Sequence, residues 1–494
     1  MMIPILPVPK RYAWGSLDRL QTMFGDGDTS VTQGSGPLAE MWFSAHEQLP
    51  GGTPMASDAL IREESCGQGE EKSRSAEGDR NIGVRRVALP DLLKQNPEGL
   101  LGRVASRQWG PMLPYLLKVI AVREPLSLQV HPLDFEARRG FHREEDAGVP
   151  LQAPDRSFRD TRGKHEMVVA LEPFAASVGF APIARQIRAL RSVTHPLPQR
   201  MADILESGEP STPRIDAMMP ESARVWSQTA RRVFRAFALA ASYGGDIGTV
   251  GLLDAAAGCV EGNAERLMLS NAMRAAQSFP ADASALCLLM MNPVRLRKGE
   301  SISIAPGTPH VYLHGLAAEI MTNSDNVLRA GLTVKYRDLP NLLRSLNAMP
   351  TPPAAPYVVG DRAFGIAGRL GGDRVVGGLL GGGRVVGGGY ADEGVERAGM
   401  ALYHPCVDEF SLIYGHVDGG RVAEWPLPML AQDRPRIVVC VKGAVQCRTE
   451  RPGGITDAVL TCGKAMFVPA SDGLLRVVGY EKTGGDILLA STGI

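Results

Sequence analysis

The chain has 494 residues, which is too many for a single hydrophobic core and predicts about two to four domains. Its 53 basic and 53 acidic side chains balance, which excludes both the basic surface that holds nucleic acid and an acidic tail, so the expected partners are small molecules. The seven cysteines include no CxxC pair, which excludes a disulfide framework or a structural zinc knuckle and favours a reducing compartment.

The N-terminus and the apolar runs predict neither export nor membrane insertion. The N-terminal segment MMIPILPVPKRYAWGS has a short apolar run that prolines interrupt, and its basic pair follows that run, so it does not fit a signal peptide. The longest apolar run, ALCLLMM at 285–291, is far too short to cross a bilayer. We therefore expect a cytoplasmic protein with no membrane partner.

The first part of the chain, up to about residue 180, has the alternation and punctuation of β-strands. Strand-like segments follow one another as AEMWFSAH (39–46), PYLLKVIAV (114–122), LSLQVHP (126–132) and HEMVVAL (165–171). Between the first two, residues 62–81 are charged and nearly free of large apolar side chains. We expect these residues to form a disordered surface insertion, with a regulatory loop as the alternative.

The segment LSLQVHP places its polar side chains on one face of a strand. Because strand side chains alternate, Ser127, Gln129 and His131 point one way and three aliphatic side chains point the other. A strand face exposed to water would favour Thr, Lys or Glu at these positions. Two interpretations remain open from these residues alone: a half-exposed strand with incidental polar side chains, or the wall of a binding site.

Residues 183–278 change to helical spacing. Apolar side chains such as Val225, Val233 and Phe237 recur at intervals that place them on one helix face. We expect a helical domain in which the aromatic side chains of this segment form the core.

Strand character returns after the helical segment. It is expected at 285–315 and again from 400 to 494. Between these blocks, residues 368–378 and 378–388 are glycine-rich near copies. They lack the strand-GxxxxGK[ST]-helix context of a phosphate loop, so we expect a mobile linker or a long hairpin.

Four side chains from separate segments could meet and bind a metal ion: Gln129, His131, Glu166 and His310. One amide oxygen, one carboxylate and two imidazoles suit zinc and do not exclude manganese or cobalt. In the strand-like GKHEM, alternation puts Lys164 on the same face as Glu166 and His165 on the opposite face.

The segment before His310 has the most specific local pattern. Gly299 is followed after six residues by PGTPH (306–310), close to the second cupin motif, in which a Pro/Gly turn directs a histidine into a small β-barrel. A histidine after such a turn is, by itself, more often a surface or capping residue. Together with LSLQVHP it favours a jelly-roll barrel with a metal in its mouth.

Taken together, these blocks resemble type I mannose-6-phosphate isomerases. The matching stretches are YAWGS (12–16), AEMWFSAH (39–46), LPYLLKVIAVREPLSLQVHP (113–132), GKHEM (163–167), LLMMNPVRLRKGESISIAPGTPHVYLHG (288–315) and AEIMTNSDNVLRAGLTVKYRD (318–338). The resemblance implies a mainly β fold with a metal-binding cupin jelly-roll barrel, an inserted helical domain and a C-terminal barrel-like β domain. The implied boundaries are 1–180 and 285–345 for the catalytic cupin domain, 181–284 for the helical domain and 346–494 for the C-terminal domain, with a Gly-rich linker or hairpin at 365–389.

The resemblance also implies a reaction and its residues. The reaction is the zinc-dependent, reversible interconversion of mannose 6-phosphate and fructose 6-phosphate through an enediol(ate), in support of mannose catabolism and GDP-mannose supply. One zinc ion per chain would be held by Gln129, His131, Glu166 and His310. Catalytic positions fall on Arg329, Lys164 and Glu319, and substrate-binding positions on Ser127, Lys118, Tyr312 and Lys335. The expected protein is a monomer whose partner is a sugar phosphate.

Two features depart from the family pattern. His165 stands where the family usually has proline between Lys and Glu, and because proline lacks an amide N–H, we expect the N–H of His165 to be dispensable. The C-terminal block has no histidine where a metal cupin would have one, so we expect that domain to be structural.

Two other functions compete with the isomerase. A cupin that only senses sugar phosphate would tend to lose a metal ligand or the arginine, and neither is lost here. An iron dioxygenase usually has paired histidines on its first motif strand, where this chain has Gln129.

Overall fold

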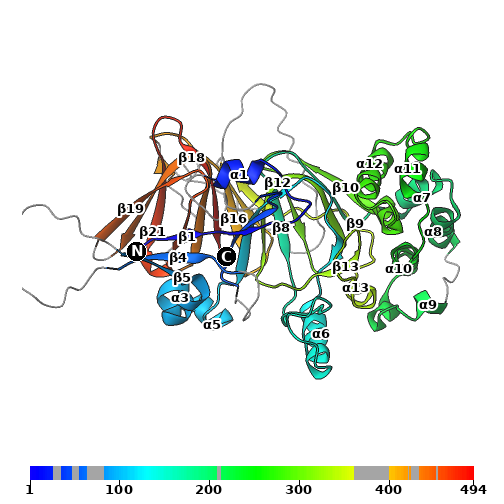
Figure 1. The fold of residues 1–494 in the computed structure, drawn as a ribbon, viewed down its shortest axis with the longest axis horizontal. Coiled ribbons are helices and arrows are strands. Elements are labelled where there is room, and N and C mark those ends of the chain that lie inside the picture. The colour runs from blue at the N-terminus through cyan, green and yellow to red at the C-terminus, as the bar shows by residue number, and fades with distance from the viewer. Residues whose placement is uncertain are drawn as a thin grey trace, which may run out of the picture.

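The computed structural model describes residues 1–25, 35–46, 55–63, 83–207, 213–360, 400–420, 422–423, 433–451 and 454–493. The protein is mainly β and is elongated, with the C-terminal strands at one end, a second sheet in the middle and a group of helices at the other end (Figure 1). Residues 62–63 of the expected insertion belong to a strand, whereas the rest of that insertion and the glycine repeats at 365–389 lie outside the described residues.

Within the described residues, the middle sheet has ten strands and is organised around one long strand. Its members are β2 (Val8–Lys10), β3 (Glu40–Phe43), β6 (Tyr115–Val122), β7 (Leu128–Val130), β8 (Glu166–Ala170), β9 (Phe174–Phe180), β10 (Met291–Leu296), β11 (Ser301–Ile304), β12 (His310–Thr322) and β13 (Leu328–Gly331). Strand β12 pairs with β6, β7, β8 and β9, so residues far apart in the sequence meet along its length. Among the described strands, the hydrogen-bonded order of neither sheet closes into a ring.

The second sheet has twelve strands in the described part of the chain and combines both ends of the sequence. Its members are β1 (Ile3–Leu6), β4 (Asp58–Glu63), β5 (Gly83–Ala88), β14 (Tyr357–Gly360), β15 (Ala401–His404), β16 (Ser411–Val417), β17 (Val422–Ala423), β18 (Arg436–Arg451), β19 (Gly454–Thr461), β20 (Ala465–Val468), β21 (Leu474–Gly479) and β22 (Gly485–Ser491). Strand β1 lies between β20 and β4, with Ile3 opposite Phe467. The first strand of the chain is therefore an interior member of the C-terminal sheet (Figure 1).

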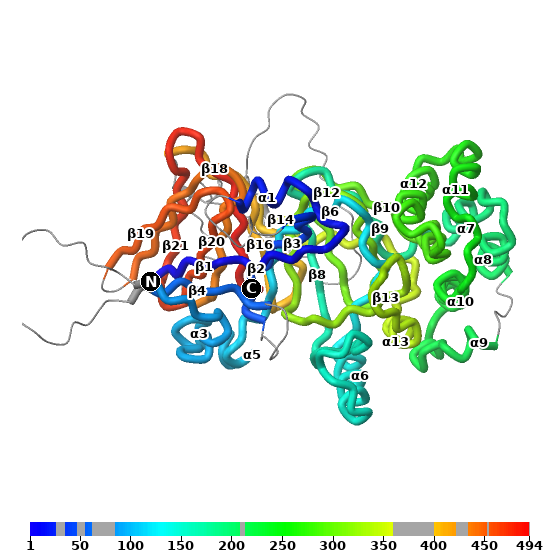
Figure 2. The backbone as a smooth tube through the Cα atoms, in the orientation of Figure 1, coloured from blue at the N-terminus to red at the C-terminus, as the bar shows by residue number. Residues whose placement is uncertain are grey.

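The helical character predicted for residues 183–278 is confirmed. The described helices of the chain are α1 (Arg19–Phe24), α3 (Leu89–Gln95), α4 (Pro97–Leu101), α5 (Arg103–Trp109), α6 (Asp134–Asp146), α7 (Ile183–Arg191), α8 (Pro196–Ser207), α9 (Pro213–Asp216), η1 (Glu221–Val225), α10 (Gln228–Ala241), α11 (Thr249–Ala257), α12 (Asn263–Ser278), η2 (Ala283–Met290), α13 (Leu339–Ser345) and η4 (Ala470–Asp472). None of them is long and apolar enough to cross a membrane. Helix α12 contacts β9, β10 and β12 and joins the helices to the middle sheet (Figure 2).

One prediction in the helical segment is wrong. Val225 does not share the buried stripe of Val233 and Phe237, because it ends the 3-10 helix η1 and is 90% exposed. Helix α10 starts only after Ser227, whose side chain accepts a hydrogen bond from the amide of Ala230.

The run ALCLLMM at 285–291 is also not the strand that we expected. It forms the 3-10 helix η2 up to Met290, and the strand β10 begins at Met291. Every residue of η2 is buried among the helices and the sheet, so its composition shows no periodicity that would separate a helix from a strand.

Strand β12 separates two apolar environments. Val311 and Leu313 belong to the core that the helices share with the sheet, whereas Tyr312 belongs to a smaller core on the other face. This alternation follows from the strand pleat, and it places the side chains near the N-terminus of β12 on two different sides of the sheet.

Candidate metal centre

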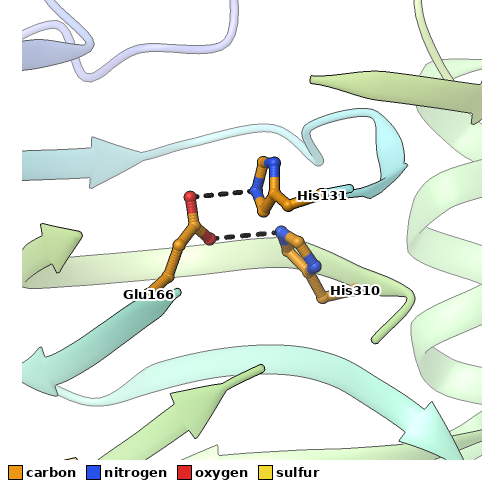
Figure 3. Close-up of side chains that lie close together, drawn as sticks. All are labelled: His131, Glu166 and His310. Atoms are coloured by element: carbon orange, nitrogen blue, oxygen red, sulfur yellow. Dashed lines mark ion pairs between the residues drawn. The ribbon is translucent and has the colours of Figure 1, made fainter. Parts of the chain in front are cut away.

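Three buried side chains converge on one point in the middle sheet. One ligand atom from each of His131, Glu166 and His310 lies within 4.8 Å of the other two, and we call these residues the His–Glu–His cluster. His131 Nε2 is 2.9 Å from Glu166 Oε1, and His310 Nε2 is 3.4 Å from Glu166 Oε2 (Figure 3). The carboxylate thus lies between two imidazoles from different segments, since His131 directly follows β7 and His310 begins β12.

Strand pairing explains why these side chains meet. His310 is the first residue of β12 and lies opposite Gln129 of β7, two positions before His131. Glu166, the first residue of β8, lies opposite Ile304 at the end of β11, and the turn of residues 305–309 leads from there to His310. The expected Pro/Gly turn precedes His310, and in it Gly307 has a φ of 84° and donates its amide N–H to the carbonyl of His131 at 2.8 Å.

Both imidazoles direct Nε2 towards the carboxylate. His131 Nδ1 is 2.8 Å from the carbonyl oxygen of Asn326, and His310 Nδ1 is 3.0 Å from that of Thr308. Because a carbonyl can only accept, Nδ1 carries the hydrogen in each neutral ring and Nε2 presents a lone pair. This is the tautomer that a metal-bound histidine requires.

The cluster has an unsatisfied buried atom at its centre. His131 Nε2 is buried and has no hydrogen-bond partner among the described residues, although Glu166 Oε1 lies nearby. Burial lowers the pKa of His131 to about 4, against the opposing charge of Glu166. A lone pair that faces a carboxylate is unfavourable without a cation between them, so the arrangement suits a metal ion.

The spacing of the ligand atoms also fits zinc. Two ligands at about 2.0–2.1 Å from a tetrahedral ion lie roughly 3.3 Å apart. The two contacts of the Glu166 carboxylate, 2.9 and 3.4 Å, bracket this separation.

Gln129 lies beside the cluster, as its strand face predicts. Its Nε2 is 2.9 Å from His310 Nε2, and its Oε1 accepts a hydrogen bond from Ser127 at 3.2 Å. The side-chain amide therefore contacts the cluster through its nitrogen in this structure. Rotation of the amide by half a turn would exchange the two atoms.

Lys164 and Tyr312 both contact the carboxylate of the cluster. Lys164 Nζ lies 3.3 Å from Glu166 Oε1, and the Tyr312 hydroxyl donates to Glu166 Oε2 at 3.3 Å. Burial alone would raise the pKa of Glu166, but His131 and Lys164 outweigh it and hold that pKa well below its usual range. Glu166 is therefore a carboxylate, the form that binds metal.

Lys118 and Glu319 form a buried ion pair beside this site. They lie opposite each other on β6 and β12, and Nζ is 3.0 Å from Oε2. Burial opposes the charge on Lys118, but Glu319 and further carboxylates raise its pKa. Burial raises the pKa of Glu319, and Lys118 only partly offsets this effect. Both predicted pocket residues are thus present, and each is the other's main partner.

Arg329 and Lys335 bring positive charge to the same region. Arg329 lies on β13 opposite Gln129, and among the described residues its guanidinium has one hydrogen-bond contact, 3.5 Å long, to the carbonyl of Val327. The ammonium of Lys335 lies 4.4 Å from the ring centroid of Tyr12. Burial, followed by the charge of Arg329, lowers the pKa of Lys335. Neither cation forms a salt bridge with a carboxylate in the described part of the chain.

Residues missed by the sequence reasoning extend this polar region. Trp42 of β3 lies opposite Lys118, and the ammonium groups of Lys10 and Lys118 lie 4.5 and 5.0 Å from its ring centroid. Glu40, two positions earlier on the same strand face, accepts a hydrogen bond from the Trp42 indole. The alternation of Glu40 and Trp42 in AEMWFSAH was a signal that could have identified them.

Asn326 was also missed, and no spacing in the sequence points to it. Its side-chain amide donates to the backbone carbonyl groups of Asp160 and Arg162, both at 2.9 Å. The backbone carbonyl oxygen of Asn326 faces His131 Nδ1. These contacts fix the carbonyl that orients the His131 ring.

His165 does not belong to the His–Glu–His cluster, in agreement with strand alternation. Its ring is half-buried elsewhere, and burial lowers its pKa against the charges of Glu409 and Asp134. The expectation that its N–H is dispensable needs correction, because that N–H donates to Thr322 Oγ1 at 3.3 Å.

Comparison with known proteins supports the resemblance seen in the sequence. Residues 2–183 match the family described as phosphomannose isomerase type I, catalytic domain. The chain is 32% identical over 339 residues to mannose-6-phosphate isomerase of Escherichia coli K12, covering 68% of this chain and 72% of that protein. It is 24% identical over 495 residues to the enzyme of Rattus norvegicus, covering 97% and 96%.

The fold agrees with these relatives. A crystal structure of mannose 6-phosphate isomerase from Salmonella typhimurium, bound to fructose 6-phosphate and zinc, aligns over 100% of both chains with a TM-score of 0.68 and 24% identity. Because the Escherichia coli relative is 32% identical over 68% of this chain and 72% of its own length, and residues 2–183 match the family, the chain belongs to the type I mannose-6-phosphate isomerase family.

Proposed function

We propose that this protein interconverts mannose 6-phosphate and fructose 6-phosphate and that it requires zinc. The observation that carries the proposal is the buried His–Glu–His cluster with both Nε2 atoms directed at one carboxylate. Family membership supports the same reaction, because the curated relatives are named for it. The sensing cupin is not favoured, since every predicted ligand and Arg329 are present.

The proposed zinc ligands are the cluster residues and Gln129. Gln129 would bind through Oε1 after its amide rotates, because an amide nitrogen cannot ligate in its neutral form. The chemistry that zinc supplies in such a site is Lewis-acid polarisation of the sugar carbonyl and stabilisation of the oxyanion that develops from it.

The proton moves between C2 and C1 of the sugar, and the chain must supply the group that carries it. We propose Lys164 and Glu319 for this task. Both side chains are nearly fully buried, at 4% exposure each, which excludes water from the exchange. The raised pKa of Glu319 brings a carboxyl closer to the range in which it can both accept and donate a proton.

The phosphate end of the substrate requires cations that are not already neutralised. We propose Arg329 and Lys335 for this end, with Ser127 and Lys118 nearer the sugar, because no carboxylate forms a salt bridge with Arg329 or Lys335 among the described residues. The planar guanidinium of Arg329 can also hold the anionic intermediate, since it lies opposite Gln129.

We further propose that the middle sheet is the cupin jelly roll of the family. The support is the origin of its strands in the sequence. All the described strands of this sheet come from residues before 181 or between 285 and 345. The helices of residues 181–284 would then be an insertion. The C-terminal domain would consist of residues 346–494 together with β1, β4 and β5, because these three strands belong to its sheet.

Removal of the metal tests the proposed function directly. Chelator-treated protein is expected to lose nearly all isomerase activity in a coupled assay, and stoichiometric zinc is expected to restore it, because the cluster leaves Nε2 of His131 unsatisfied without a cation. Full activity in protein shown by metal analysis to be zinc-free would contradict the proposal.

Variants at His165 test the strand register around Glu166. His165→Ala is expected to keep zinc and most activity, because the ring lies away from the cluster. His165→Pro also loses the N–H bond to Thr322, so we expect a modest loss of stability, about 1 kcal/mol, with zinc retained. Glu166→Gln should weaken both zinc binding and turnover. Zinc per chain, turnover and thermal midpoint are measured for all three, and zinc loss in His165→Ala would show that the register is wrong.

A further inference from the structure

A hollow of about 350 Å³ lies between helix α12 and the middle sheet. Arg274 and Asn271 of α12 line one side of it, and Arg295 of β10 lines another. Leu313 and His314 of β12 complete the wall. The hollow thus gathers two guanidinium groups and an imidazole from three different elements.

The hollow is separate from the His–Glu–His cluster. Leu313 belongs to the core shared with the helices, whereas its neighbour Tyr312 donates a hydrogen bond to Glu166 on the other face of β12. His314 lines the hollow together with Leu313 because the pairing of β12 with β9 shifts register between Tyr312 and His314, so the hollow and the cluster lie on different sides of β12.

Both arginines are held in place by neutral acceptors. Arg274 donates to the carbonyl groups of Leu313 at 3.0 Å and Arg123 at 2.9 Å. Arg295 donates to the side-chain oxygen of Asn271 at 2.7 Å and to the carbonyl of the residue before it at 3.0 Å. No carboxylate pairs with either guanidinium among the described residues. Their orientation is fixed, while their charge is left without a counter-ion.

The surrounding charges do not supply that counter-ion. Burial and then the charge of Arg274 lower the pKa of Arg295, as expected for two like charges at close range. Glu172 is near His314, but its carboxylate pairs with Arg19. The ring of His314 is exposed and makes no hydrogen bond among the described residues.

We propose that this hollow binds a phosphoryl group, either free phosphate or the phosphate of a small ester, between Arg274 and Arg295. Guanidinium groups match the oxygens of phosphate with paired N–H donors, and pre-oriented groups lose little entropy on binding. The volume is within the range of small-molecule sites, so it leaves space for a group esterified to the phosphate.

Calorimetric titration of the full chain with inorganic phosphate and with glycerol 3-phosphate tests this proposal. The titrations use an Arg329→Ala background, which weakens phosphate binding at the proposed active site. Arg295→Gln is expected to reduce the affinity for the tighter of the two ligands about tenfold or more. The matched control is Arg297→Gln, because Arg297 is exposed and pairs with Glu300. The tighter ligand identifies the source, free or esterified.

A second pair of variants tests the hollow without removing a structural contact. His314→Glu adds a negative charge beside the guanidinium groups and should weaken phosphate binding, whereas His314→Gln should not. Equal affinity in Arg295→Gln and Arg297→Gln, or in the two His314 variants, would overturn the proposal, as would the absence of saturable binding. The Arg295→Gln and His314→Glu variants in an otherwise unchanged chain should retain isomerase activity, so this test is independent of the proposed function.

Discussion

His310→Ala is expected to remove bound zinc and nearly all turnover while the chain stays folded. His310 supplies one of the two Nε2 atoms of the cluster, and its ring is oriented by the carbonyl of Thr308. Its removal leaves the Glu166 carboxylate with one imidazole too few to hold zinc. Zinc per chain by elemental analysis, turnover, and circular dichroism to verify folding give the result.

The matched control is His314→Ala, four residues later on the same strand. His314 is exposed, lines the hollow beside α12 and lies beyond a register shift that interrupts the pairing of β12 with β9 after Tyr312, so this variant should keep both zinc and activity. Gln129→Leu should also lose zinc if the amide is a ligand, because leucine has a similar size and no donor atom. Stoichiometric zinc in either His310→Ala or Gln129→Leu would remove that residue from the ligand set.

Arg329→Ala is expected to lower turnover about 10²–10³-fold with zinc content unchanged, the usual effect of removing one positioned charge-stabilising donor. Arg329 lies opposite Gln129 and is half-buried, and within the part of the chain that the structure describes its guanidinium has only a long contact to Val327, which leaves it available to the substrate. Because it does not contact the cluster, the metal should remain bound. Turnover and KM are measured by the coupled assay alongside zinc per chain.

Arg329→Lys separates two functions of this residue. An ammonium keeps the charge but cannot reproduce the planar pair of N–H donors, so we expect this variant to be nearly as poor as Arg329→Ala. Arg297→Ala, at an exposed position, is the control for general loss of positive charge. Wild-type turnover in Arg329→Lys would show that the residue is only a counter-charge for the phosphate.

Much of the candidate site could be predicted from the sequence because it depends on local geometry. Strand alternation places Gln129 and His131 on one face, and it puts Lys164 rather than His165 beside Glu166. The Pro/Gly turn before His310 is a local signal too. These features depend only on residues that are close in the sequence. The resemblance to the isomerase family then predicted that the separate segments form one site.

Other features depend on contacts between distant segments and have no local signal. The carbonyl of Asn326 reaches His131 only because β12 and the loop after it fold back over β7. The run at 283–290 is buried on all sides, so its composition does not distinguish a 3-10 helix from a strand. The short apolar run at the N-terminus likewise gives no local sign that it forms β1 or that its partner is β20.

The position of β1 limits how the protein can be divided into fragments. A piece ending near residue 345 would contain the whole His–Glu–His cluster but would lack β20, the partner of β1. The backbone donors and acceptors of β1 along that edge would then be open to other chains, which is a known route to aggregation. Expression trials for a minimal catalytic unit should therefore keep the C-terminal sheet or remove β1, β4 and β5 together with it.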